Sequence, residues 1–568
     1  MASLLRIKQL TAGFGATESS STKALHNITL TIERGQWLAL VGESGSGKSI
    51  TALSILKLLT TPPIHYSNDS SITLTVNDTT TSLLYASAQQ LQQIRGKHIG
   101  MIFQEPMSSL NPTMRCGEQV AEVLQQHLQL TKQAAYEKVI ALFTQVQLPN
   151  PQLTYKKYPH QLSGGQKQRV MIAMALSCNP SLLICDEPTT ALDVTVQQEI
   201  LDLLATLQQE KGIGILFISH DLALVAKYAT HIAVLYQGSV VEYNTKNNLL
   251  QQPQHPYTKA LLACRPANYP QGVRLPVVSD FLNNNKPINL AVNKNTIQAL
   301  PHITNKPLIN IQELTITYPT TSNIWSRTTN SYTAVQQLSA TIFEGETVGL
   351  VGESGCGKTS LGRALLGLQP YQQGVVLWQG KPIHQFSRKE KQAYATAAQL
   401  IFQDPFAALN PSITIGEAIM APVKYHRIET STAAAKQWVI QLLEQVGLQA
   451  DHFNRYPHAF SGGQRQRIVI ARALALKPKF VVCDESVAAL DVSVQAQVLN
   501  LLNDLKKAFQ FTTLFISHDI EVVRYISNRI WVMHQGKIVE EGLASNVYEQ
   551  PQHAYTQQLI AAVPKLVF

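Results

Sequence analysis

The chain has 568 residues and a formal net charge of +9, with 45% hydrophobic and 15% charged residues. This length allows two to four domains, and the composition is that of a soluble globular protein rather than a disordered chain. We expect no membrane helix and no signal peptide, because no long apolar run occurs and the start has no basic segment followed by an apolar core. The six cysteines have no paired spacing, which favours reduced thiols, as in the cytosol. The charge fits a solvated surface with phosphate-binding lysines, and a basic face near anionic lipid is the alternative.

A phosphate-binding loop is the first strong signal along the chain. The apolar run 37–41 leads into Gly42-Glu43-Ser44-Gly45-Ser46-Gly47-Lys48-Ser49, and helical spacing follows over 48–59. This fits G-x-x-x-x-G-K-[ST], whose backbone N–H groups wrap phosphates while the Lys and the hydroxyl meet the terminal phosphates and Mg²⁺. Strand, glycine loop and helix N-terminus form the context that such a loop needs. We therefore predict nucleoside triphosphate binding by Gly42, Ser44, Gly45, Gly47, Lys48 and Ser49.

Three further elements follow in the same half. Residues 117–148 are rich in Gln, Ala and Leu at helical spacing, which predicts a helical insertion. Residues 181–185 and 213–218 predict buried strands, which end at Asp186-Glu187 and at Ser219-His220. Ligands of open α/β sheets bind at the carboxyl ends of parallel strands, so we expect these polar residues to converge on one crevice.

Hydrolysis of a γ-phosphate needs charge neutralisation, Mg²⁺ and a positioned water, which assigns a role to each group. Lys48 would neutralise charge, and Ser49 with Asp186 would bind the metal. Glu187 would polarise the attacking water, and His220 would contact the γ-phosphate.

The same series of motifs occurs twice. Ser-Gly-Gly-Gln at 163 recurs at 461, Asp-Glu at 186 recurs at 484 and His at 220 recurs at 518, a constant offset of 298 residues. The second phosphate loop contributes Gly352, Ser354, Gly355, Gly357, Lys358 and Thr359. Asp484, Glu485 and His518 take the roles of their counterparts. A repeat this long predicts two domains rather than a solenoid.

The two copies are separated by a segment of different composition. Five prolines and the run Asn283-Asn284-Asn285-Lys286 mark an irregular linker. We predict a first domain over 1–265, a linker over 266–306 and a second domain over 307–568.

With these motifs the chain resembles an ATP-binding-cassette (ABC) ATPase over nearly all of its length. Gln104 and Gln403 match the Q-loop of that family, which adds them to the predicted catalytic and metal-binding residues. Its signature is matched by Ser163, Gly164, Gly165 and Gln166 and by Ser461, Gly462, Gly463 and Gln464. Its D-loop is matched by Ala191-Leu192-Asp193 and Ala489-Leu490-Asp491. Phe14 and Tyr318 match the aromatic residue that stacks on adenine, although a strand aromatic is as often part of a core.

The resemblance implies an α/β fold with two tandem P-loop NTPase domains. Each would have a RecA-like core sheet, an antiparallel β-subdomain and a helical subdomain. In this family the two domains pair head to tail, so each ATP lies between one phosphate loop and the opposite signature. Here that pairing would occur within one chain, with ATP and Mg²⁺ as the cofactors.

Two local features resemble the peptide and nickel import branch of the family. One is the stretch after each Q-loop, 104–112 and 403–411. The other is the tail sequence Gln254-His255-Pro256-Tyr257-Thr258, which recurs from Gln552 with Ala554 in place of Pro. This branch implies integral-membrane permease partners, an extracytoplasmic solute-binding protein and a peripheral place on the cytoplasmic face of the inner membrane. We expect no nucleic-acid partner, and no iron–sulfur cluster because Cys264 stands alone.

Three alternatives stay open at this point, and the first is export or another role within the ABC family. A soluble twin-cassette protein acting on the ribosome would also lack a membrane domain, although its linker is normally long, helical and charged. The second site could also be non-hydrolytic, because Ser486-Val487-Ala488 follows its acidic pair where the first copy has Pro188-Thr189-Thr190. Proline fixes φ, so the second turn is expected to be the less rigid one.

Overall fold

The computed structural model describes residues 3–15, 22–60, 62–104, 109–189, 193–283, 304–319, 331–488 and 490–564. They divide into two compact units, with the main break between Leu262 and Ala263. Each unit contains one copy of the repeated motifs, as the sequence predicts. No helix in these ranges is both long enough and apolar enough to cross a membrane. Parts of the predicted linker, D-loops and post-Q-loop stretch lie outside the described residues, namely 284–303, 190–192, 489 and 105–108.

A six-stranded sheet forms the core of the first unit. Its strand order is β11-β10-β3-β9-β8-β7, and its strands are β3 Trp37–Val41, β7 Ile99–Ile102, β8 Leu182–Asp186, β9 Gly214–Ser219, β10 His231–Tyr236 and β11 Ser239–Thr245. Neighbouring strands are parallel except for β10 and β11. Every residue of β3, β8 and β9 is buried, as expected of parallel strands covered on both faces. The carboxyl ends of these three strands therefore meet at one edge, where the polar motifs follow.

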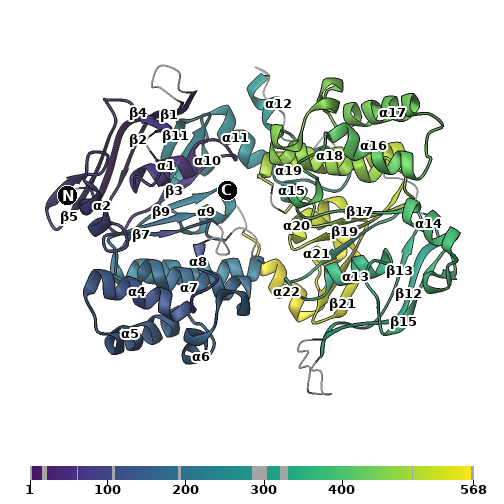
Figure 1. Cartoon of the computed structure of the whole chain (residues 1–568), viewed down its shortest axis with the longest axis horizontal. Coiled ribbons are helices and arrows are strands. Elements are labelled where there is room, and N and C mark those ends of the chain that lie inside the picture. Colours follow the sequence, from purple (N-terminus) through teal and green to yellow (C-terminus); the bar gives the residue numbers. More distant parts are fainter. Residues whose placement is uncertain are drawn as a thin grey trace. The chain divides into compact units, whose positions relative to one another are not determined.

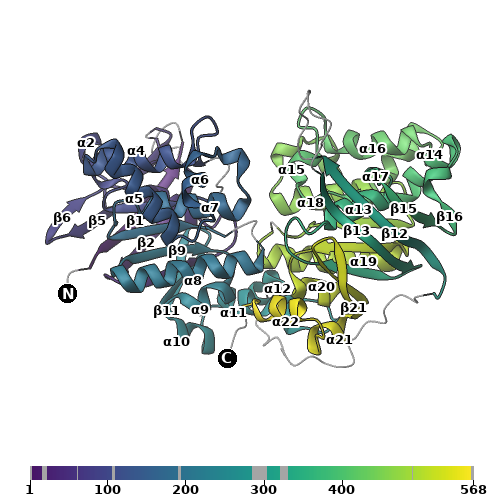
Figure 2. The same cartoon turned by 90° about the horizontal axis from the view of Figure 1, so that it is seen from below.

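The second unit repeats this sheet in the order β17-β18-β19-β14-β20-β21. The strands are β14 Thr347–Val351, β17 Ala398–Ile401, β18 Phe480–Asp484, β19 Thr512–Ser517, β20 Arg529–His534 and β21 Lys537–Leu543. Again only the last pair, β20 and β21, is antiparallel. The helices α20 Ile520–Ile526, α21 Ala544–Glu549 and α22 Ala554–Ala561 lie with β21 at one end of this unit (Figure 2).

An antiparallel sheet packs beside each core sheet. In the first unit it consists of β1 Leu5–Phe14, β2 Thr22–Ile32, β4 Ile64–Tyr66, β5 Ser71–Val76 and β6 Thr79–Ser82. In the second unit it consists of β12 Pro307–Pro319, β13 Ser331–Phe343, β15 Gln373–Trp378 and β16 Lys381–Pro382. Each shares one continuous hydrophobic core with the parallel sheet of its own unit.

A helical subdomain completes each unit, on the opposite side from the antiparallel sheet (Figure 1). The first contains α4 Cys116–Leu128, α5 Lys132–Gln145, α6 Pro151–Lys156 and α7 Gly164–Leu176. The second contains α15 Pro405–Ala408, α16 Ile415–Tyr425, α17 Thr432–Gln445 and α18 Gly462–Leu474. The predicted insertion over 117–148 is therefore two helices, because Gln129 takes a left-handed conformation and Thr131 caps the next helix.

The remaining helices cover the core sheets. They are α1 Lys48–Ile55, α2 Ala88–Ile94, α8 Val194–Lys211, α9 Leu222–Tyr228, α10 Lys246–Gln251, α11 Pro256–Ala263, α13 Lys358–Leu365, α14 Arg388–Ala397 and α19 Val492–Phe509. Helix α1 ends four residues before the predicted limit of Leu59, because Lys57 has a φ of 48° and turns the chain out of the helix.

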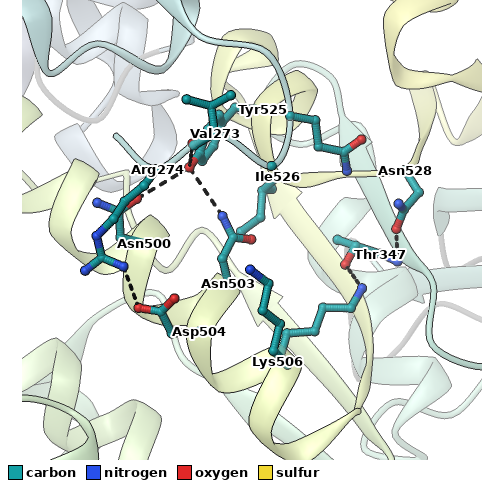
Figure 3. A pocket seen from close by; sticks show the side chains of 13 residues that line it. Val273, Arg274, Thr347, Asn500, Asn503, Asp504, Lys506, Tyr525, Ile526 and Asn528 are labelled. Atoms are coloured by element: carbon teal, nitrogen blue, oxygen red, sulfur yellow. Dashed lines mark hydrogen bonds and ion pairs between the residues drawn. The ribbon is translucent and has the colours of Figure 1, made fainter. Parts of the chain in front are cut away.

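Part of the predicted irregular linker, residues 266–280, is folded onto the second unit. Residues 263–280 belong to that unit, with a short 3₁₀ helix at Pro266–Asn268 and the start of α12 Val278–Asn283. The side-chain amide of Asn500 in α19 accepts from the N–H of Leu275 at 2.9 Å and donates to its carbonyl at 2.8 Å. The Tyr525 hydroxyl of α20 donates to the carbonyl of Val273 at 2.8 Å (Figure 3).

The contact between residues 263–280 and the second unit also contains charged groups. Arg265 and Glu521 form a buried ion pair at 3.1 Å, and Arg274 pairs with Asp504 at 2.8 Å near the surface (Figure 3). The cavity between the segment and α19 has a volume of about 30 Å³, which suits ordered water rather than a ligand. The segment is therefore packed as part of the second unit, although its composition resembles that of a flexible linker.

Candidate functional site

The loop after β3 turns sharply into α1, and Gly42 and Gly47 have no room for side chains. A Cβ atom on Gly42 would lie 2.2 Å from the carbonyl oxygen of Leu235, and Gly47 has a φ of 106°. Gly352 and Gly357 are confined in the same way in the loop between β14 and α13. A tight turn followed by a helix N-terminus presents several backbone N–H groups to one point, which is a cradle for anionic oxygen atoms.

A buried lysine crosses each loop. The Nζ atom of Lys48 donates to the carbonyls of Gly42 and Glu43 at 2.7 and 2.9 Å. Lys358 makes the equivalent bonds in its own loop at 2.7 and 2.8 Å. The Ser46 hydroxyl is also buried in the first loop, without a hydrogen-bond partner among the described residues. A buried ammonium group and an unsatisfied hydroxyl beside an N–H cradle fit a phosphate group.

A hydroxyl and a carboxylate meet behind each lysine. Ser49 donates to an oxygen of Asp186 at 3.1 Å, and Thr359 donates to Asp484 at 3.0 Å. Burial raises the pKa of both aspartates, while the hydroxyl hydrogen bond opposes that shift. A buried carboxylate beside a hydroxyl offers the hard oxygen ligands that Mg²⁺ prefers, and a cation there would favour the ionised form.

The second acidic residue of the first copy is at the centre of a polar cluster. The side-chain amide of Gln104 donates to Glu187 at 3.2 Å. The Nδ1 atom of His220 lies 3.4 Å from the same carboxylate, and Nζ of Lys48 lies 4.0 Å from it. The Q-loop, the acidic pair, the strand-end histidine and the phosphate loop therefore converge, as the sequence predicts.

The second copy repeats this cluster with small differences. Gln403 donates to Glu485 at 2.8 Å, and Nδ1 of His518 lies 3.8 Å from that carboxylate. Burial disfavours the charge on Glu485, but the hydrogen bond and charge of His518, together with Lys358, lower its pKa overall. The reverse holds for His518, where burial is outweighed by Glu485 and the pKa is raised. The two side chains lie within ion-pair distance at the end of the sheet, and each favours the charged form of the other.

The predicted signatures open the helices α7 and α18. Ser163 accepts a hydrogen bond from the N–H of Gln166, whose side chain bonds back to the serine N–H. Ser461 and Gln464 form the same capping box. These polar contacts stay within each helix start, so they do not join a signature to the loop of its own unit. The capping serine leaves the first two N–H groups of each helix, those of the two glycines, directed toward the open helix end, which makes the signature a second anion cradle.

The two predicted adenine-stacking residues are placed differently. Phe14 ends β1 and is 37% exposed. Tyr318 is half-buried, and its hydroxyl lies 3.0 Å from the Ser360 hydroxyl on α13. The neighbouring Tyr332 on β13 is 50% exposed and donates to the carbonyl of Gly355 in the phosphate loop at 2.7 Å. Tyr332 is thus a further candidate for stacking on adenine. What points to it is its register opposite Tyr318, which only the structure shows.

Two tail tyrosines also contact the phosphate loops, which the sequence analysis missed. Tyr257 accepts a hydrogen bond from the N–H of Glu43, and Tyr555 accepts one from the N–H of Glu353. Both belong to the tail sequence that resembles the peptide and nickel import branch. Their reach to the loop spans more than two hundred residues of sequence, so no local pattern reveals it.

Family models match both copies of the repeated motifs. A family model described as ABC transporter matches residues 25–190 and 335–488. A second model, described as oligopeptide/dipeptide transporter, C-terminal region, matches residues 241–281 and 539–568.

Curated relatives match almost the whole chain. A protein of Salmonella choleraesuis strain SC-B67 named glutathione import ATP-binding protein GsiA is 45% identical, over 96% of this chain and 87% of its own length. The protein of the same name from Escherichia coli strain K12 is 44% identical, over 99% of this chain and 89% of its own length. A solved structure titled as a dimeric post-hydrolysis state of the ATP-binding cassette MJ0796 bound to ADP and Pi is 26% identical, with a TM-score of 0.38, over 42% of this chain and 98% of that one.

Proposed function

Because the chain belongs to the ABC transporter family of ATPases, we propose that it is the energising subunit of a peptide importer, in which both cassettes hydrolyse ATP. The duplicated cluster of lysine, hydroxyl–aspartate pair and glutamate carries the proposal. The match of both tails to the oligopeptide/dipeptide C-terminal region supports the peptide branch. The curated relatives are named for glutathione import, so glutathione is the first solute to test. They give no support to a role on the ribosome.

Each residue of the cluster has a chemical task. Lys48 and Lys358 donate to the terminal phosphates of ATP while the loop carbonyls keep each ammonium group in place. Ser49 with Asp186, and Thr359 with Asp484, would hold Mg²⁺, which would supply positive charge beside the phosphates.

The two glutamates and their hydrogen-bond partners position the attacking water. Glu187 and Glu485 orient the attacking water and polarise its O–H bond. Gln104 and Gln403 fix the carboxylates through the amide hydrogen bonds described above and would also take part in holding Mg²⁺. His220 and His518 contact the γ-phosphate from the neighbouring strand end.

We further propose that each nucleotide is completed by the signature of the other cassette. The signature at Ser163 would face the loop of Lys358, and the signature at Ser461 would face the loop of Lys48. The N–H groups that open α7 and α18 support this, since the first turn of each helix fits a phosphate group. ATP would then join the cassettes, and hydrolysis would release them.

An arginine in one signature tests this pairing. Ser461→Arg should abolish ATP turnover at the loop of Lys48, measured by photo-crosslinking of trapped nucleotide at each loop separately. Ser163→Arg is the matched control and should act on the loop of Lys358. Loss at the loop of the same cassette would contradict the head-to-tail arrangement.

Cell fractionation and uptake test the transport role. The chain should be recovered with membranes, at their cytoplasmic face, when the permease encoded by neighbouring genes is present, and not with ribosomes. Cells lacking the chain should lose uptake of labelled glutathione and recover it with the natural chain, but not with the Glu187→Gln and Glu485→Gln double variant. Unchanged uptake of glutathione and of a labelled dipeptide in those cells would overturn the proposal of peptide import.

A further inference from the structure

The tail sequence of each cassette contains a buried tyrosine that contacts the phosphate loop. The Tyr257 side chain of α11 is 0% exposed, and its hydroxyl accepts from the N–H of Glu43 at 2.9 Å. The Tyr555 side chain of α22 is 7% exposed, and its hydroxyl accepts from the N–H of Glu353 at 2.9 Å. The same contact in both copies indicates a requirement of the loop rather than an accident of packing.

The tyrosine and the lysine bind opposite ends of one peptide group. The N–H of Glu43 and the carbonyl of Gly42 belong to the same peptide unit, and that carbonyl accepts from Lys48 at 2.7 Å. In the second cassette the carbonyl of Gly352 accepts from Lys358 at 2.7 Å. A peptide group whose N–H is already hydrogen-bonded is a stronger acceptor at its oxygen, and its plane is fixed at both ends. The tail hydroxyl therefore acts on the group that holds the lysine.

The tyrosine is itself held in place by the tail. The carboxylate of Glu242 on β11 accepts from the N–H groups of Gln254 and His255 at 2.9 and 3.0 Å. The Nδ1 atom of His255 accepts from the N–H of Tyr257 at 3.2 Å. The ring of Tyr257 packs on that of Tyr236, with the centroids 4.3 Å apart.

The second cassette repeats these supports. Glu540 accepts from the N–H groups of Gln552 and His553 at 2.8 and 3.0 Å. Tyr555 packs on His534 at a centroid distance of 4.0 Å. The hydroxyl position is thus fixed by several contacts that do not involve the loop, which is what a positioning group requires.

We propose that Tyr257 and Tyr555 are positioning residues that set the first peptide of each phosphate loop, and through it the lysine that binds the terminal phosphate. The inference rests on the proposed role of the two loops in ATP binding. It assigns the tail a function in nucleotide discrimination, because the lysine binds the β- and γ-phosphates and ADP lacks the second of these.

Removing one hydroxyl tests the inference. Tyr257→Phe keeps the ring and its packing but removes the acceptor for the N–H of Glu43. In a chain that also carries Lys358→Ala, so that binding reports on the first loop, the affinity for ATP should fall about three- to tenfold. The affinity for ADP should change less than twofold, measured by competition with a fluorescent nucleotide. Tyr236→Phe is the matched control, because its hydroxyl bonds to the side chain of Gln237 and not to the loop.

Each other outcome overturns the inference. Unchanged ATP affinity in the Tyr257→Phe chain would show that the hydroxyl does not position the lysine. Equal losses for ATP and ADP, together with a lower melting temperature, would show that the hydroxyl only stabilises the fold. Lys48→Ala separates the proposals, because retention of ATP affinity in that variant would refute the loop assignment itself.

Discussion

Replacing Glu485 by glutamine tests the assignment of the water-polarising carboxylate in the second cassette. The two side chains have nearly the same size, and the amide oxygen can still accept the hydrogen bond that Gln403 makes at 2.8 Å. The substitution therefore removes charge and basicity while it keeps packing. A positioned general base contributes about 10²- to 10⁴-fold to a rate, which corresponds to about 3–5 kcal/mol of the barrier at that site.

The residual activity of the whole chain then shows how the sites are coupled. If the two sites are independent, the variant should keep about half of the steady-state rate. If both sites must hydrolyse ATP in each cycle, the rate should fall to that of the slow, substituted site. We expect Glu485→Gln and Glu187→Gln each to reduce phosphate release below about 10% of the natural rate, at unchanged melting temperature. The double variant should retain ATP without hydrolysing it. Near-normal turnover of Glu485→Gln would show that the second site is not catalytic, and a half-maximal rate would refute the coupling.

The remaining predictions concern stability, protonation and the turn after the second acidic pair. Asn500→Ala should lower the free energy of unfolding of the second unit by about 2–4 kcal/mol, because two buried backbone groups of Leu275 lose their partner; a loss below about 0.5 kcal/mol in denaturant titrations would contradict this. Glu485→Gln should lower the pKa of His518 toward its ordinary value of 6.5, followed by histidine NMR, and an unchanged pKa would refute the ion pair. Since that pKa is raised in the folded state, its contribution to stability is complete below pH 6.5 and is lost as the pH rises through the raised pKa. Ser486→Pro should keep ATPase activity within about twofold, because Glu485 already has the backbone conformation that its counterpart adopts before proline; a tenfold loss would contradict this.

The sequence was sufficient to predict the parts of the site that depend on local geometry. A loop such as 42–49 needs glycine where carbonyls approach closely and a lysine where phosphate binds, so residue type and position are tied together. The acidic pairs and strand-end histidines were predictable for a related reason. Each follows a short, fully apolar strand, and parallel strands bring their ends to one edge of the sheet.

The contacts that were missed depend on packing between distant segments. Tyr257 is an aromatic residue in a helix, a pattern that indicates only burial, and its bond to Glu43 requires the fold to bring the tail beside the loop. The segment around Leu275 was similarly predicted to be irregular, because its prolines and weak periodicity resemble those of a linker. The segment is held by side chains of α19 and α20 that form hydrogen bonds with its backbone. The amino-acid composition of the segment does not reveal these distant partners.

The difference between the cassettes after the acidic pair can now be weighed physically. Glu187 and Glu485 have φ values of 46° and 48°, a left-handed conformation that costs a residue with a side chain about 1–2 kcal/mol. Both hold it although proline follows one and serine the other. In each case the glutamate N–H donates to the carbonyl of the adjacent strand, to Ile218 at 3.1 Å and to Ile516 at 3.0 Å. The register of the parallel sheet therefore imposes the turn, and the proline does not. Because the same backbone strain orients both carboxylates, any inequality between the two ATP sites must arise from groups outside this turn.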